Sequence, residues 1–267
     1  MYSFGQLSNY DVNTALGALR KIRNERSVQL RKEYSKAETA ARTFTDPHLN
    51  AEGLKARRDE MLAQARAALA AAVQQMEAEA KQAADTVRRY TQDKQSAASA
   101  DPNAQLLAEM RQGKAWDRAR ALLDSGRSPA EVIATADVDT LRALRTELPT
   151  YLATQVKREP GLLQAHSQAE PFDPAPVLRT IDLALAEKIG GTEGQAMRYA
   201  LDLAAVEPGV NVTLKSLRTE ALGLMDSTAR MSAAMEAHYV DQEAARTLAL
   251  DAPQAVSSGP TPGMTAA

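Results

Sequence analysis

Apolar residues recur at helical spacing along most of this chain, and the most regular row lies between Leu69 and Tyr90. Successive members of the row are alternately four and three residues apart, which is the spacing of a heptad seam between paired helices. The row extends backward to Leu62, although Arg66 occupies the position between. We expect this seam to close either a hairpin within the chain or an oligomer. The seam residues are Leu62, Leu69, Val73, Met76, Ala80, Ala83, Val87 and Tyr90.

The helix that carries the seam is expected to begin near Asp46-Pro47 or Asn50, because both sites offer an N-cap. No glycine or proline interrupts the chain between Gly53 and about Gln95, so the helix would reach about 70 Å at 1.5 Å per residue. This length favours a rod over a compact core.

A preceding helix is predicted from about Asp11 to Arg42, and its apolar row is interrupted by arginines. The cations are distributed around the helix and do not gather on one face. Two interpretations follow: a solvated helix, or contact with an acidic partner or nucleic acid. The candidate contact residues are Arg20, Arg23, Arg26 and Arg31.

Shorter helices are expected after the small-residue linker at residues 96–102. Trp116 is interpreted as a core anchor of this part. Ser128 and Glu131 form a capping box that opens a brief helix, and Asp137 or Asp139 caps the next one. That helix should kink or stop at Pro149.

The proline-rich stretch at residues 170–176 separates a final helical region. One helix should end at Gly190-Gly191 and another at about Ala205, before Pro208-Gly209. A last long helix is predicted over residues 214–250. The sequence thus predicts an all-α fold, divided into a basic hairpin or coiled-coil-like region (1–95), a small helical subdomain (96–170), an acidic helical region (171–250) and a flexible tail (251–267).

The composition favours packed rods. Alanine accounts for 52 of the 267 residues, whereas Phe occurs three times and Trp once. Alanine favours helix and lets two backbones approach closely, but it contributes little burial energy. The net charge of −2 conceals a gradient, because residues 1–48 hold eight Lys and Arg against five Asp and Glu, and residues 161–267 hold seven against thirteen.

No catalytic or cofactor motif stands out. The chain has no cysteine, and His48, His166 and His238 are far apart without metal-site spacing. The glycines at 190–194 lack the spacing of a phosphate loop. No stretch has the ~20 apolar residues of a membrane span. We therefore expect no enzyme, no cofactor, no metal and no membrane partner.

An Ala/Arg/Gln-rich rod, a compact helical middle, an acidic helical end and a flexible tail together resemble the helical head-assembly proteins of tailed bacteriophages, including scaffold-like and minor virion proteins. The resemblance implies a non-enzymatic structural role, homo-oligomerisation, capsid or connector partners, and a location in the virion or host cytoplasm. The alternative is a nucleic-acid-binding or adaptor protein that uses the basic N-terminal helix.

Overall fold

The computed structural model describes residues 7–96, 102–156 and 173–224, together with scattered positions between 228 and 242. Every element between residues 7 and 224 that it describes is helical, which confirms the all-α prediction. The elements are α1 (Asn9–Lys21), the π-helical turn η1 (Ile22–Arg26), α2 (Ser27–Thr43), α3 (Ala51–Ser96), α4 (Pro102–Asp124), α5 (Pro129–Thr135), α6 (Val138–Val156), α7 (Ala175–Ile189) and α8 (Gly191–Ala221).

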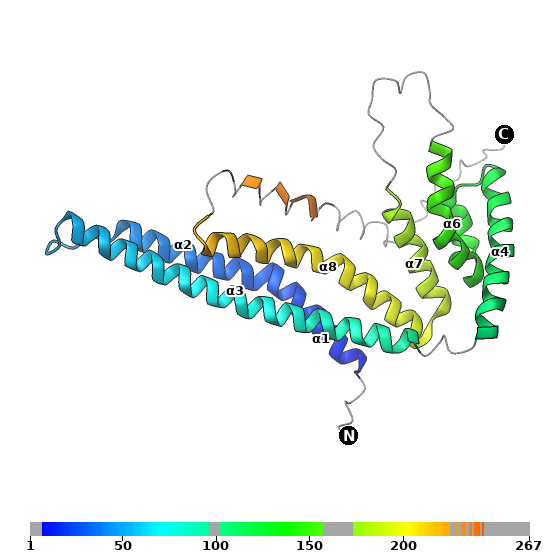
Figure 1. Cartoon of the computed structure of the whole chain (residues 1–267), viewed down its shortest axis with the longest axis horizontal. Helices are drawn as coiled ribbons and strands as arrows, with labels where there is room; N and C mark the ends of the chain where they lie inside the picture. The colour runs from blue at the N-terminus through cyan, green and yellow to red at the C-terminus, as the bar shows by residue number, and fades with distance from the viewer. Residues whose placement is uncertain are drawn as a thin grey trace, which may run out of the picture.

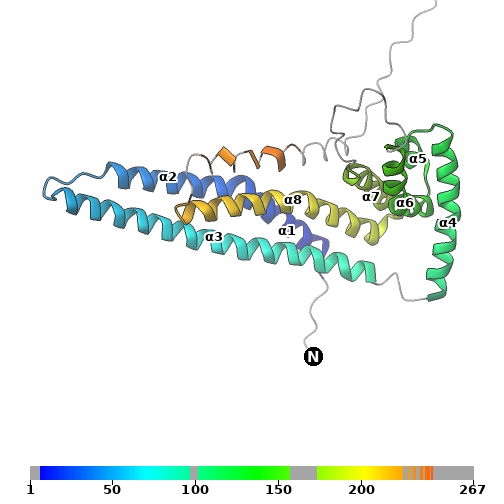
Figure 2. The same ribbon diagram turned by 45° about the horizontal axis from the view of Figure 1, so that its top comes forward.

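Three helical arms form a long rod (Figure 1). The arm made of α1, η1 and α2 turns at residues 44–50 and returns as the antiparallel helix α3, and α8 lies along both (Figures 1 and 2). One apolar core joins the three arms. Its larger buried members include Leu16, Leu19, Leu69, Val73, Met76, Leu203, Leu214 and Leu217.

The hairpin of α2 and α3 projects beyond the end of α8 (Figure 1). Gly223, just past the end of α8, lies against the guanidinium group of Arg66 in α3, so residues 35–65 form a tip of two helices. Ala41 is the only buried residue between positions 35 and 65. Arg58 closes the turn by donating two hydrogen bonds to the carbonyl oxygen of Phe44, at 2.9 and 2.7 Å.

Helices α4 to α7 pack around a second core at one end of the rod (Figure 2). Trp116 is half-buried at its edge and meets the Tyr151 ring edge-on, with centroids 5.9 Å apart. The two cores separate α7 from α8, because α7 contributes Ile181 and Leu185 to the second core while α8 packs mainly in the rod. The linker residues 97–101, the segment 157–172 and the tail 251–267 lie outside the described residues.

Local sequence signals set several helix ends. Asn50 caps α3 by accepting a hydrogen bond from the Gly53 amide at 2.8 Å. Ser128 and Glu131 form the expected capping box of α5. Asp137 caps α6 through the Thr140 amide, also at 2.8 Å. These side chains satisfy amides that have no partner within their own helix.

The predicted helix end before Pro208 is wrong, and of the kink or stop predicted at Pro149 the stop does not occur. Helix α6 continues through Pro149, and α8 runs through Pro208 as one helix in place of the two expected. Each proline lacks the backbone N–H that would donate to the carbonyl oxygen four residues earlier. That oxygen belongs to Arg145 for Pro149 and to Ala204 for Pro208. Both residues are exposed, so water can donate to the oxygen instead. Apolar residues on both sides of each proline pack into the same core, and their burial offsets the loss of that hydrogen bond.

The prediction of one unbroken helix over residues 214–250 is also wrong, and its predicted end at residue 250 lies outside the described residues. Helix α8 ends at Ala221, far short of residue 250. Gly223 adopts a positive φ of 70°, and the amide of Leu224 returns to the carbonyl oxygen of Thr219 at 3.2 Å. This is the Schellman arrangement, which glycine accommodates without steric cost. Helical residues resume at described positions between 228 and 242.

Candidate binding groove between α3 and α8

The predicted seam is closed within the chain. Its members from Leu69 to Tyr90 are 0–7% exposed and belong to the rod core, where α3 meets the other two arms. Leu62 is only half-buried, and Arg66 is exposed at the level where α8 ends. Of the two alternatives for the seam, the structure shows the one within the chain. Sequence reasoning did not find α8 as a partner of the seam, because Pro208 concealed the continuity of that helix.

The four arginines predicted to contact an acidic partner or nucleic acid are directed at neighbouring helices of the same chain. Arg20 lies 3.9 Å from a carboxylate oxygen of Asp202 in α8. Arg31, also toward α8, lies 3.5 Å from Glu220 and donates a hydrogen bond to the Ser216 hydroxyl at 3.0 Å. The acidic surface that these arginines reach therefore belongs to the same chain.

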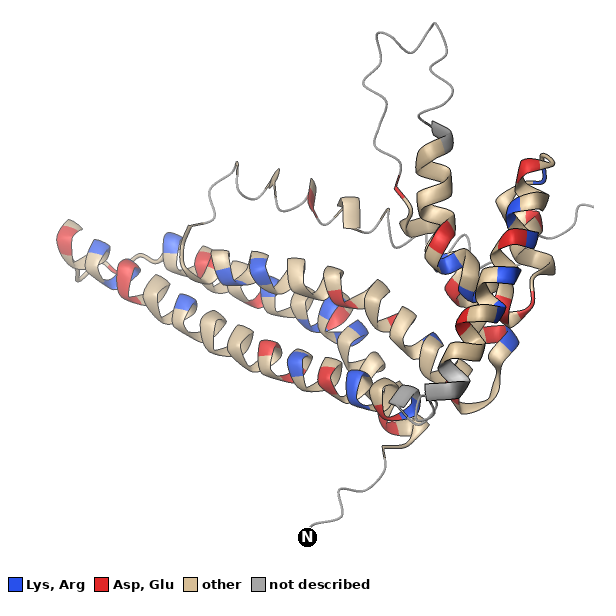
Figure 3. Cartoon of the chain, turned by 45° about the vertical axis from the view of Figure 1, so that its right-hand side comes forward, with Lys and Arg blue, Asp and Glu red and all other residues tan. Residues whose placement is uncertain are grey.

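The other two cations lie in the π-helical turn. Arg26 pairs with Glu79 of α3, and its hydrogen bond lowers the pKa of that carboxyl. The guanidinium group of Arg23 lies against Gly209 of α8, so closely that a Cβ there would be 2.5 Å from Nη1. Basic and acidic positions are interspersed along the rod (Figure 3).

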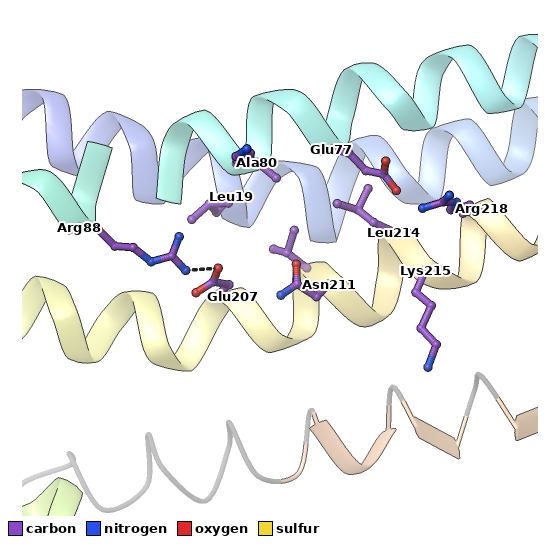
Figure 4. A pocket seen from close by; sticks show the side chains of 11 residues that line it. Leu19, Glu77, Ala80, Arg88, Glu207, Asn211, Leu214, Lys215 and Arg218 are labelled. Carbon is purple, nitrogen blue, oxygen red and sulfur yellow. Dashed lines mark hydrogen bonds and ion pairs between the residues drawn. The ribbon is translucent and has the colours of Figure 1, made fainter. Parts of the chain in front are cut away.

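Between α3 and α8 lies a groove of about 370 Å³ (Figure 4). Its floor is apolar and comes from three helices: Leu19 from α1, Ala80 from α3, and Val210 and Leu214 from α8. The polar walls are Glu77, Lys81 and Arg88 on α3, and Glu207, Asn211, Lys215 and Arg218 on α8.

Four cations and two carboxylates line the groove, which is basic by two charges. At one end Arg88 bridges the walls by pairing with Glu207, and this hydrogen bond raises the pKa of Arg88 (Figure 4). At the other end Lys215 lies 3.5 Å from Glu236 of the C-terminal segment. The floor residues are 1–7% exposed, so the accessible surface of the groove is made mainly by its polar walls.

A polar cluster joins the three arms at the end of the rod nearest the N-terminus. Tyr90 donates its hydroxyl to Asn9, and Asn9 donates to Gln195 at 2.9 Å. Tyr199 accepts hydrogen bonds from Asn13 at 3.0 Å and from Gln195 at 3.1 Å. The Tyr90 and Tyr199 rings meet edge-on at 5.8 Å. Sequence reasoning placed Tyr90 on the seam but gave no sign of its polar partners, which lie far away in the chain.

Among the described residues, three or more His, Cys, Asp or Glu side chains do not gather in a way that could hold a metal ion. His48 and His238 are far from each other in sequence, and His166 lies outside the described residues. Within the described part of the chain, helices with the length and apolarity needed to cross a membrane are absent.

Comparisons of this chain with protein-family models, with curated proteins and with solved structures found no match.

Proposed function

We propose that this chain is a non-enzymatic helical structural protein that works in assembly, through contacts with copies of itself and with a larger shell. The likeness to head-assembly proteins of tailed bacteriophages belongs to this proposal, with capsid or connector subunits as partners and the virion or host cytoplasm as the location. A rod with a projecting hairpin supports it, because such a shape presents long surfaces to neighbours.

One observation carries the proposal. The first half of α4 presents Leu106, Leu107 and Met110, which are 54–59% exposed. These residues are three and four positions apart around Met110, so they lie on one face of the helix. Contiguous exposed apolar side chains mark interaction sites more often than scattered ones do. We therefore assign this face of α4 to contact between copies.

The alternative role in nucleic-acid binding has less support. Arg20, Arg26 and Arg31 pair with carboxylates of the same chain, and Arg23 is packed on Gly209. A phosphate backbone would have to compete with these internal partners. The adaptor role of the N-terminal helix is weakened by the same contacts.

The test is the solution mass of the full chain, measured by light scattering over a range of concentrations. We expect a multiple of the monomer mass. Leu106→Glu with Met110→Glu should shift the protein to monomer, because two carboxylates would have to be buried in the contact. The helix content should not change, since both positions are exposed.

A matched control alters charge without removing the apolar face. Arg111→Gln with Lys114→Gln changes the net charge by the same amount on the same helix and should preserve the oligomer. A monomer at every concentration, or an oligomer that the glutamates do not alter, would contradict self-association through α4. Binding to a shell would be tested by co-sedimentation of the chain with assembled capsid shells of a tailed bacteriophage.

A further inference from the structure

The apolar row at the start of α4 faces away from the rest of the molecule. The side chains that α4 places in or against the second core come from its second half: Trp116, Ala119, Leu122 and Leu123. Successive helical residues are about 100° apart, so Met110 lies opposite Ala119 around the helix. Among the described helices, α4 is also the outermost one at its end of the rod (Figures 1 and 2). A partner of this row therefore approaches from beyond that end.

Leu106, Met110 and Gly113 follow one another at intervals of four and three residues, the spacing of a coiled-coil seam. We name these three exposed residues the outer seam. A Cβ on Gly113 would meet nothing within 4 Å, so packing within the chain does not require glycine there. Glycine inside a helix is less stable than alanine, but it permits another backbone to approach closely. Its place on the seam favours a second helix as the partner.

Opposite charges flank the outer seam on its two sides. Glu109 lies on one side and Lys114 on the other, and both are exposed. In a parallel pair of helices Glu109 of one copy faces the partner's Lys114, and such flanking ion pairs set the orientation of coiled coils. In an antiparallel pair related by a two-fold axis, each flank faces its own copy, so charges of the same sign would oppose each other. The charges therefore favour the parallel arrangement.

We propose that two copies of this chain associate through a parallel pair of α4 helices, with their outer seams in contact and Glu109 of each copy paired with the partner's Lys114. This inference rests on the proposed contact between copies and adds its geometry. The contact is short, because the next positions of the same spacing, Asn103 and Asp117, are polar. The pair should accordingly dissociate on dilution.

The position of α4 determines the shape of such a pair. Helix α4 runs across the end of the rod (Figures 1 and 2). A half-turn about an axis along α4 therefore points the second rod away from the first. The two hairpin tips, residues 35–65 of each copy, then lie at opposite ends of the pair. The dimer is a spacer with one tip at each end, a form that can bridge two neighbours in an assembly.

Single cysteines in the full chain test the orientation, because the native sequence contains no cysteine. In a parallel pair every seam residue meets its own copy, so Leu106→Cys, Met110→Cys and Gly113→Cys should each form a disulfide-linked dimer under mild oxidation. Arg111→Cys is the matched control, because Arg111 is exposed on the same helix but lies about 100° further round it than Met110. We expect each seam variant to cross-link at least about tenfold faster than the control.

The pattern of cross-links separates this inference from the contact on which it rests. An antiparallel pair brings at most one seam residue against its own copy. Cross-linking at fewer than all three seam positions, or equally fast cross-linking of the control, would therefore overturn the parallel pair. If the mass of the wild type were still that of an oligomer sensitive to Leu106→Glu with Met110→Glu, contact through α4 would stand. A chain that is monomeric at every concentration would overturn both.

Charge reversal gives a second readout of the same geometry. Glu109→Lys places like charges opposite each other twice in the dimer and should weaken it about tenfold, as measured by sedimentation equilibrium. Adding Lys114→Glu to this variant makes the pairs opposite in charge again and should restore the wild-type affinity. Lys114→Gln removes only an exposed ion pair and should leave the dimer in place. An affinity unchanged by Glu109→Lys, or not restored by the second reversal, would overturn the pairing.

Small-angle scattering tests the shape. The maximum dimension of the wild-type dimer should be about twice that of the monomeric variant Leu106→Glu with Met110→Glu, because each rod contains a helix of 46 residues, about 69 Å long, and the two rods point apart. A dimer no longer than the monomer would have its rods side by side and would overturn the proposal.

Discussion

The carbonyl oxygen of Ala186 occupies the place where a side chain on Gly194 would begin. A Cβ on Gly194 would lie 2.2 Å from that oxygen, well inside van der Waals contact. Ala186 is near the end of α7 and Gly194 is in the first turn of α8. This contact therefore sets the corner at which the second core is joined to the rod.

Gly194→Ala should accordingly destabilise the protein. The clash is with backbone, which cannot rotate away as a side chain can, so we expect a loss of about 1–3 kcal/mol of unfolding free energy. Gly113→Ala is the control, because a Cβ there meets nothing within 4 Å on a helix. It should be neutral or stabilise by up to about 1 kcal/mol. Thermal melts of both variants measure the difference, and equal melting temperatures would refute the close contact.

Gly209→Ala tests the second close contact, in which the Arg23 guanidinium lies on the α8 backbone. The new methyl group should displace the guanidinium and cost about 1 kcal/mol, less than at Gly194 because a flexible side chain can move. In an Arg23→Ala background the same change should cost less, since the obstacle is gone and alanine favours helix. Urea unfolding of the four proteins in this double-mutant cycle gives the coupling, and a coupling of zero would argue against the contact.

Leu69→Asp with Met76→Asp should abolish helix pairing in the rod. Both residues are 2% exposed in the shared core, and each substitution would bury an unpaired carboxylate at a cost of several kcal/mol. Ala68→Asp with Gln74→Asp adds the same charges at exposed neighbours of the seam and should leave the fold intact. Elution volume and melting temperature are the measurements. If the seam variant matched the wild type in both, the seam would have no structural role.

Tyr90→Phe tests the polar cluster. Loss of the hydroxyl that Tyr90 donates to Asn9 should cost about 1 kcal/mol of unfolding free energy. Burial raises the pKa of Tyr90, with a further contribution from Tyr199. Because the folded-state pKa is raised, this contribution to stability is complete below the unfolded pKa of about 10 and is lost as the pH rises above it.

The pH dependence of stability distinguishes the buried Tyr90 hydroxyl from a ring that contributes packing alone. Melting temperatures measured between about pH 8 and pH 11 should fall more steeply for the wild type than for Tyr90→Phe. Tyr10 is 78% exposed, so Tyr10→Phe is the control and should keep the steep fall. Parallel curves for wild type and Tyr90→Phe would show that Tyr90 ionises as freely in the folded chain as in the unfolded one.

Local signals in the sequence determined the fold class and several helix ends of this protein. The heptad spacing from Leu69 to Tyr90 identified the buried face of α3, because side-chain direction in a helix follows from spacing alone. Asn50, Ser128 and Asp137 were identifiable as caps, because capping joins residues only a few positions apart. The α4 row escaped notice as a surface, since Leu106 and Met110 have the spacing of ordinary core residues.

Only the tertiary structure decided which helix pairs with which, and what the arginines contact. Pro208 disfavours helix locally by about 3 kcal/mol, but Leu203 and Val210 on its two sides are buried in one core, and the combined burial outweighs that cost. Arg20 and Arg31 find their carboxylates on α8, more than 180 residues away in the chain. The groove and the polar cluster both depend on such distant pairings, which side-chain spacing within one helix does not encode.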